Sequence, residues 1–126
     1  MSRILRMFKQ AEREAERSIH QHPVGCIIAK GSNIIARGHN QVRYKGRGKR
    51  FTNYAESLHA ERDATSKVSK EYIQGATAYV YRKGKRGTAR LSKPCEHCRK
   101  LFELLGIKTV YYTDPENPAG YGELRL

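Results

Sequence analysis

Residues 57–113 alternate between helix and strand patterns, and this order constrains the fold more than any other feature of the chain. Apolar residues spaced along one helix face predict a helix over residues 57–70, and residues 76–82 alternate as a strand does. The same two patterns return as a helix over 95–105 and a strand over 107–113. Segments in this order pack their helices against a central sheet, so an α/β fold is expected.

The rest of the chain adds one helix and further strands to this unit. An amphipathic pattern over residues 3–18 predicts the first helix. Two β-rich runs, 24–29 and 34–37, flank a short turn that contains glycine and asparagine, which suits a tight hairpin. Too few residues follow the last predicted strand for another helix, but residues 122–126 are expected to return as a fifth, antiparallel strand. The prediction is a mixed sheet of four to five strands flanked by helices.

The size and the cysteine content narrow the class of protein. A chain of 126 residues is the usual length of one domain, so residues 1–126 are expected to form a single unit. The three cysteines, of which Cys95 and Cys98 form a C-x-x-C pair, suit a metal site better than a disulfide framework. No apolar run approaches the length of a membrane span. These features predict a cytoplasmic protein without a membrane partner.

Two short motifs bring together residues that bind metals. They are HAE at residues 59–61 and PCEHC at residues 94–98, and each is predicted to lie in the first turn of a helix. Cys95 and Cys98 share one helix face, where the positive helix N-terminus is expected to lower the thiolate pKa. Together with the imidazole of His59, two thiolates balance the charge of Zn²⁺ and leave one tetrahedral position open to water. The pattern therefore predicts a catalytic zinc site.

Glu61 provides the acid–base group that such a site needs. It lies two residues from His59, so its carboxylate can reach a metal-bound water without being a ligand itself. The alternative is a closed structural zinc site with a fourth protein ligand, in which a general base has no use. The candidates for that fourth ligand are His20, His22, His39 and Cys26.

In this order, the two motifs match the H-x-E and P-C-x-x-C signature of the zinc-dependent nucleobase deaminases. Over about residues 24–113 the chain resembles the cytidine and deoxycytidylate deaminase superfamily. The segments VGC at 24–26 and GHN at 38–40 resemble the family's first strand and the end of its second strand. The resemblance implies a three-layer αβα fold.

The resemblance also implies a role for each matching residue. Glu61 is expected to shuttle protons from water to the ring nitrogen and to the leaving ammonia. Asn40 and Ala60 are expected to contact the substrate. The implied zinc ligands are His59, Cys95 and Cys98.

The substrate implied by the resemblance is a cytosine base. Glu61-Arg62 and Cys98-Arg99 favour the cytidine deaminase branch. The tRNA adenosine deaminase branch shares a histidine as first ligand but normally continues through a further helix, for which this sequence leaves no room. Cytosine deamination to uracil, on a nucleotide or a single-stranded nucleic acid, is thus the leading hypothesis. The alternatives are adenosine-to-inosine deamination of an RNA and a zinc-stabilised nucleic-acid-binding module without catalysis.

The charge of the chain favours an anionic partner. Its 25 lysines and arginines against 12 acidic residues give a formal charge of +13, which attracts polyanions. Two basic loops precede the metal motifs and are expected to hold the phosphates of a cytosine nucleotide or of single-stranded DNA or RNA. Relatives often assemble, so a homo-oligomer is a further expectation. The loop cations are Arg43, Lys45, Arg47, Lys49 and Arg50 in the first loop, and Arg82, Lys83, Lys85, Arg86 and Arg90 in the second.

Overall fold

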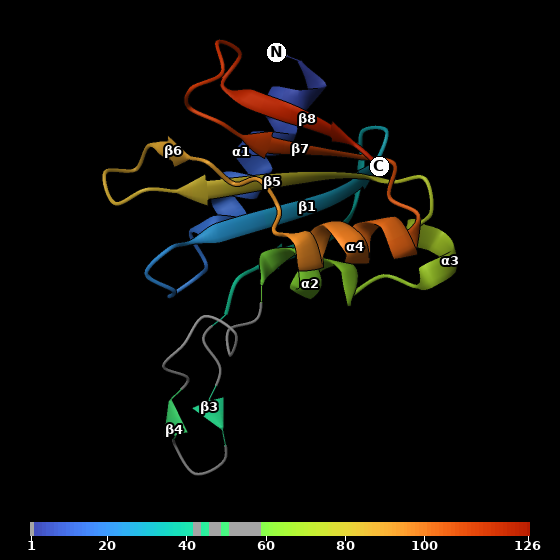
Figure 1. The fold of residues 1–126 in the computed structure, drawn as a ribbon, viewed down its shortest axis with the longest axis horizontal. Helices are drawn as coiled ribbons and strands as arrows, with labels where there is room; N and C mark the ends of the chain where they lie inside the picture. Colours follow the sequence, from blue (N-terminus) through green and yellow to red (C-terminus); the bar gives the residue numbers. More distant parts are fainter. Residues whose placement is uncertain (1, 42–43, 46–48, 51–58) are drawn as a thin grey trace.

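The computed structural model describes residues 2–41, 44–45, 49–50 and 59–126. One central sheet separates a single long helix on one face from the remaining helices on the other (Figure 1). This is the three-layer αβα arrangement expected from the sequence. The helices are α1 (Arg3–Ala15), α2 (Ala60–Thr65), α3 (Lys70–Ile73) and α4 (Glu96–Leu105).

The central sheet is mixed, as predicted. Its strand order is β2-β1-β5-β7-β8, with the short β6 paired to β5. Only β5 and β7 run parallel, because α4 connects them, and every other pair in this sheet is antiparallel. The expected fifth strand is therefore present as β8. The strands are β1 (Val24–Lys30), β2 (Asn33–His39), β5 (Thr77–Lys83), β6 (Ala89–Arg90), β7 (Thr109–Thr113) and β8 (Tyr121–Arg125).

Three parts of the chain differ from the sequence prediction, and one of them is the short β6, which lies in the expected second basic loop. The helix expected over 57–70 is two helices, α2 and α3, within the described residues. The Ser66 hydroxyl donates to the Asp63 carbonyl at 2.7 Å, and Ser69 caps the start of α3 by accepting from the Tyr72 amide. Serine side chains that bond to nearby backbone favour helix ends over helix interiors. In the expected loop before the first motif, β3 (Tyr44–Lys45) and β4 (Lys49–Arg50) form a separate antiparallel pair.

The sheet contributes to a core on each face. On the α1 face, Phe8 packs edge-on against Tyr79, with the ring centroids 6.0 Å apart. On the opposite face, Phe102 of α4 is fully buried in the same cluster as Val80 and Val110 of the sheet. Burial of such large apolar side chains holds α4, and with it the second metal motif, against the sheet.

Two glycines bring helices unusually close to the sheet. A Cβ atom at Gly25 of β1 would lie 2.6 Å from the Ala15 amide nitrogen of α1. A Cβ atom at Gly38 of β2 would lie 2.6 Å from the Ala60 carbonyl oxygen, at the start of α2. Because these neighbours are backbone atoms, neither can move aside without moving its helix. Gly38 therefore sets the distance between the sheet and the helix that carries the first motif.

Replacing Gly38 by alanine is expected to destabilise the protein by about 1–3 kcal/mol, since the added methyl group overpacks the contact with α2. Urea unfolding followed by circular dichroism measures this change. Arg37→Ala, at an exposed neighbouring position on the same strand, is the matched control and should stay within about 0.5 kcal/mol of the parent. Equal stabilities for the parent and Gly38→Ala would show that α2 does not depend on this close approach.

Candidate active site

The two predicted motifs meet where helices α2 and α4 begin. His59 is the N-cap of α2 and Cys95 is the N-cap of α4, so both lie one residue before the first turn in which the sequence placed them. Neither side chain caps its own helix. Cys98 lies in the first turn of α4 and is buried. The helix starts thus direct one imidazole and two thiols to a common point.

The distances among these three side chains fit a tetrahedral zinc site. The His59 Nδ1 atom lies 3.4 Å from the Cys98 sulfur and 3.8 Å from the Cys95 sulfur. Zinc bonds of about 2.3 Å to sulfur and 2.0–2.1 Å to nitrogen, at a tetrahedral angle, place the two ligand atoms about 3.6 Å apart. The three ligand atoms lie within 4.8 Å of one another. The geometry therefore suits zinc, with Nδ1 as the imidazole ligand atom.

The electrostatics of Cys98 differ from the sequence prediction. The helix N-terminus was expected to lower the thiol pKa, but burial raises the pKa of Cys98 well above its usual value, and the nearby Glu61 carboxylate raises it further. The desolvation of a buried thiolate outweighs the helix dipole here. A bound divalent cation reverses this balance, because it deprotonates a coordinating thiol. Cys98 is thus expected to be a thiolate only when a metal is bound.

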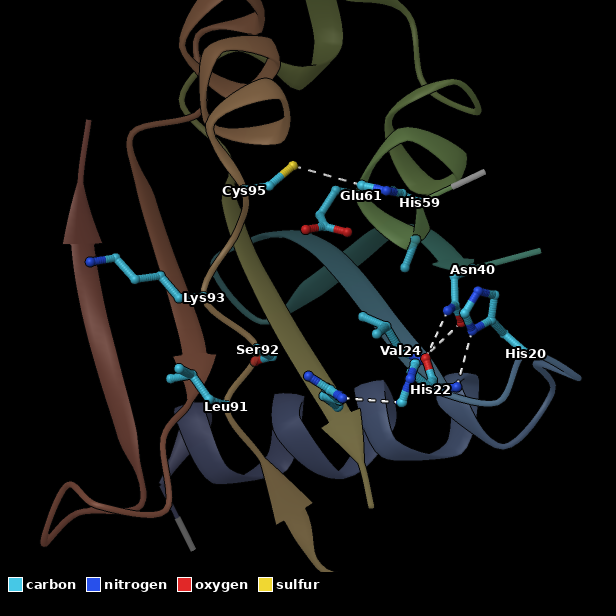
Figure 2. Close-up of a pocket in the computed structure, with 12 residues that line it drawn as sticks. His20, His22, Val24, Asn40, His59, Glu61, Leu91, Ser92, Lys93 and Cys95 are labelled. Carbon is cyan, nitrogen blue, oxygen red and sulfur yellow. Dashed lines mark hydrogen bonds between the residues drawn. The ribbon is translucent and has the colours of Figure 1, made fainter. Parts of the chain in front are cut away.

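Glu61 lies in the first turn of α2 and is 6% exposed. Burial raises the pKa of its carboxyl group, while the charge of His59 and a hydrogen bond with Cys98 oppose the shift. Figure 2 shows the Glu61 carboxylate between the side chains of Cys95 and His59, in a shared cavity of about 370 Å³. A carboxylate in this place can exchange protons with a molecule bound beside the metal ligands.

The two predicted substrate contacts also line this cavity. Ala60 is fully buried beside the metal group. The Asn40 Oδ1 accepts from the Val24 amide at 2.9 Å, and its Nδ2 donates to the His22 carbonyl at 2.8 Å. An asparagine amide has two hydrogens and two lone pairs, so one of each remains for a ligand. Asn40 thus anchors the chain before β1 and still faces the cavity, while contact with substrate stays a prediction.

The candidates for a fourth ligand have other surroundings. His39 Nδ1 pairs with the buried Glu14 carboxylate of α1 at 2.9 Å. Cys26 is completely buried in β1, and burial raises its thiol pKa well above the usual value. His20 and His22 line the cavity but are not part of the metal-binding group. Within the described ranges, that group consists of three residues, His59, Cys95 and Cys98.

The second basic loop lies within the described part of the chain. Arg82 lines the cavity, whereas Lys83 forms ion pairs with Glu12 and Glu16 of the α1 segment. The side chains of Lys85, Arg86 and Arg90 are exposed. Other predicted loop cations lie outside the described residues, or are described only as backbone in β3 and β4. These are Arg43, Arg47, Lys45, Lys49 and Arg50.

Several cavity residues were not predicted as substrate contacts. The sequence suggested His20 and His22 only as possible metal ligands. Their position just before the first strand is the sequence feature that could have indicated a contact with substrate. The segment that leads into Cys95 contributes Leu91, Ser92 and Lys93. The sequence of this segment does not indicate that it lines the cavity, because hydrogen bonds to distant strands hold it there. One of them, of 2.7 Å, runs from the Thr113 amide to the Ser92 hydroxyl.

Residues 1–114 match the family model for the cytidine and deoxycytidylate deaminase zinc-binding region. The chain belongs to this family. The family description and the His59, Cys95 and Cys98 group agree on zinc as the metal. Among the described residues, no helix has the length and apolar character needed to cross a membrane.

Individual deaminases share the fold of this chain. The apo dCMP deaminase of cyanophage S-TIM5 is 28% identical with a TM-score of 0.69, over 88% of this chain and 82% of that chain. Cytidine deaminase from Burkholderia pseudomallei has the same TM-score of 0.69 over 96% of this chain and 91% of its own, and at 19% identity it supports the fold alone.

One curated relative acts on a different base. The tRNA-specific adenosine deaminase of Aquifex aeolicus (strain VF5) is 32% identical over 107 residues, which are 83% of this chain. The match spans 62% of that relative's length. Membership in the deaminase family therefore does not by itself choose between cytosine and adenine.

Proposed function

We propose that this protein catalyses the zinc-dependent hydrolytic deamination of the cytosine base of a nucleotide to uracil. The observation that carries the proposal is the buried Glu61 carboxylate, which shares one cavity with the metal-binding group. A non-catalytic zinc module has no need of a buried carboxylate beside an incomplete ligand set, because the desolvation of that group costs stability.

In the proposed mechanism, His59 Nδ1 and the sulfurs of Cys95 and Cys98 hold the zinc. Zinc bound there would lower the pKa of a water molecule and so supply a nucleophile near neutral pH. Glu61 accepts a proton as the water oxygen bonds to C4 of the ring. It delivers this proton to the ring nitrogen, then accepts the second proton of the same oxygen and delivers it to the amino group, whose bond to C4 breaks to release ammonia. The carboxylate is regenerated, so one residue serves as base and then as acid.

Cytosine is favoured by the similarity of the chain to the dCMP deaminase of cyanophage S-TIM5, at 28% identity. The second candidate, deamination of adenine in an RNA, is favoured by the 32% identity to a tRNA-specific adenosine deaminase. The two reactions use the same acid–base chemistry at the metal. They differ in the ring that the cavity must hold and in the size of the molecule that carries it.

A substrate panel tests the proposal. Zinc-loaded protein is incubated with dCMP, CMP, deoxycytidine, a cytosine-containing single strand and an adenosine-containing RNA stem-loop, and the products are identified by mass. Conversion of dCMP or CMP to the uracil nucleotide is the expected result. Conversion of the RNA adenosine alone would transfer the assignment to the second candidate, and no conversion in any sample would favour a binding module.

A further inference from the structure

The cavity has a second polar region, apart from Glu61 and the metal group. His20 and His22 lie near Asn40, on the side of the view opposite Cys95 (Figure 2). Arg82, from the end of β5, lines the same cavity, and its Nη2 lies 3.1 Å from the His22 Nδ1. One region therefore contains acid–base and metal-binding groups, and the other contains a guanidinium and two imidazoles.

The cationic region lacks a carboxylate partner among the described residues. Within residues 2–41 and 59–126, the Arg82 side chain has a hydrogen bond with His22 and forms no ion pair. The adjacent Lys83 is different, because it pairs with two glutamates of the α1 segment. Burial lowers the pKa of His20, and the positive charges of His22, His59 and Arg82 lower it further. The positive charge of Arg82 therefore stands beside histidines rather than carboxylates in the described part of the chain, and an anion bound here would balance it.

Backbone contacts orient the donors of this region. The His22 amide donates to the His20 Nδ1 at 3.0 Å, so a neutral His20 ring carries its proton on Nε2 and can donate from there. Asn40 holds the His22 carbonyl at 2.8 Å, which fixes the segment that carries both histidines. His22 in turn accepts from Arg82, which leaves most of the five N–H donors of the guanidinium for another acceptor.

We propose that Arg82 and His20, with His22 as a positioning residue, form a subsite for the phosphate monoester of the nucleotide substrate. Phosphate offers several acceptor oxygens, which match the planar donor fork of an arginine together with an imidazole N–H. A nucleotide also has its base and its phosphate at opposite ends, as the cavity has its two polar regions. This inference extends the proposed function, and it rests on that function for the identity of the base.

The test measures binding rather than turnover. Calorimetry gives the affinity of zinc-loaded protein for dUMP, for deoxyuridine and for inorganic phosphate. The parent is expected to bind dUMP more tightly than deoxyuridine, and inorganic phosphate is expected to displace dUMP. Arg82→Gln should weaken dUMP binding on the order of 10- to 100-fold, the effect of losing charged hydrogen bonds, and leave deoxyuridine binding unchanged.

Arg6→Gln, which removes the same charge from an exposed position on α1, is the matched control and should bind dUMP as the parent does. Zinc content and thermal unfolding verify that each variant is folded. If Arg82→Gln does not fold, His20→Gln tests the same subsite and should weaken dUMP binding several-fold. Equal affinity of the parent for dUMP and deoxyuridine, or equal loss of both ligands in a folded variant, would overturn the subsite.

The source of the phosphate is tested with a uracil-containing single strand, which carries phosphodiesters. Tighter binding of dUMP than of the strand supports a subsite for a phosphate monoester. Tighter binding of the strand, if Arg82→Gln weakens it, assigns the subsite to a polymer and overturns the proposed monoester. The binding of inorganic phosphate does not depend on the base. If the protein binds inorganic phosphate but does not deaminate cytosine, the result would therefore contradict the proposed function and not this subsite.

Discussion

Replacing Glu61 by glutamine is expected to lower kcat for deamination by about 10²- to 10⁴-fold while one zinc per chain stays bound. The amide keeps the size of the side chain but cannot accept a proton from water or deliver one to the ring. The three metal-binding side chains are expected to remain in place, because the starts of α2 and α4 position them. Turnover of dCMP and elemental analysis for zinc give the two readouts.

The control for this variant is Glu71→Gln, because Glu71 is an exposed glutamate on α3 that contacts neither motif. Its turnover should equal that of the parent. Loss of zinc from Glu61→Gln would identify the carboxylate as a ligand and would favour a closed structural site. Full activity in Glu61→Gln would remove the proton shuttle from the mechanism.

Replacing Cys98 by alanine is expected to abolish stoichiometric zinc binding and to remove the stabilisation that zinc confers on the folded chain. A metal that binds only the native state stabilises it by mass action, so the parent should have a higher Tm with zinc than after chelation. In Cys98→Ala the two Tm values should coincide. Thermal unfolding with and without a chelator, alongside elemental analysis, measures both effects.

Cys26→Ala is the matched control, since it also removes a buried thiol but from the middle of β1. It should lower the Tm through the lost packing and still hold one zinc. A full zinc complement in Cys98→Ala would show that other residues complete the metal site. Zinc loss in Cys26→Ala would place Cys26 in the ligand set.

Local patterns account for most of the secondary structure. The alternation over residues 76–82 predicted β5, and the apolar spacing over residues 95–105 predicted α4. The prediction of one continuous helix over 57–70 was wrong. It followed the apolar periodicity, which does not register that Ser66 lies at the end of α2 and that Ser69 caps α3. Side chains that bond to the backbone end a helix even where its apolar face continues.

The metal group could be predicted from the sequence because its chemistry is local. His59 lies next to the first turn of α2, and Cys95 and Cys98 bracket the first turn of α4, so spacing alone limits where each ligand can point. The tertiary structure adds the 3.4 Å and 3.8 Å separations from the His59 Nδ1 that make the set compatible with zinc. Those distances depend on how both helices pack against the sheet.

The sequence by itself determined the order of the longer helices and strands, apart from the break between α2 and α3, and it identified the metal-binding side chains and the carboxylate beside them, because each follows from residue type at short spacing. Only the tertiary structure decided which other residues line the cavity that contains the metal-binding group. His22 and Arg82 are 60 residues apart in the chain, yet the pairing of β1 with β5 places them 3.1 Å from each other. Contacts between distant segments arise from sheet register and helix packing, which local periodicity does not encode.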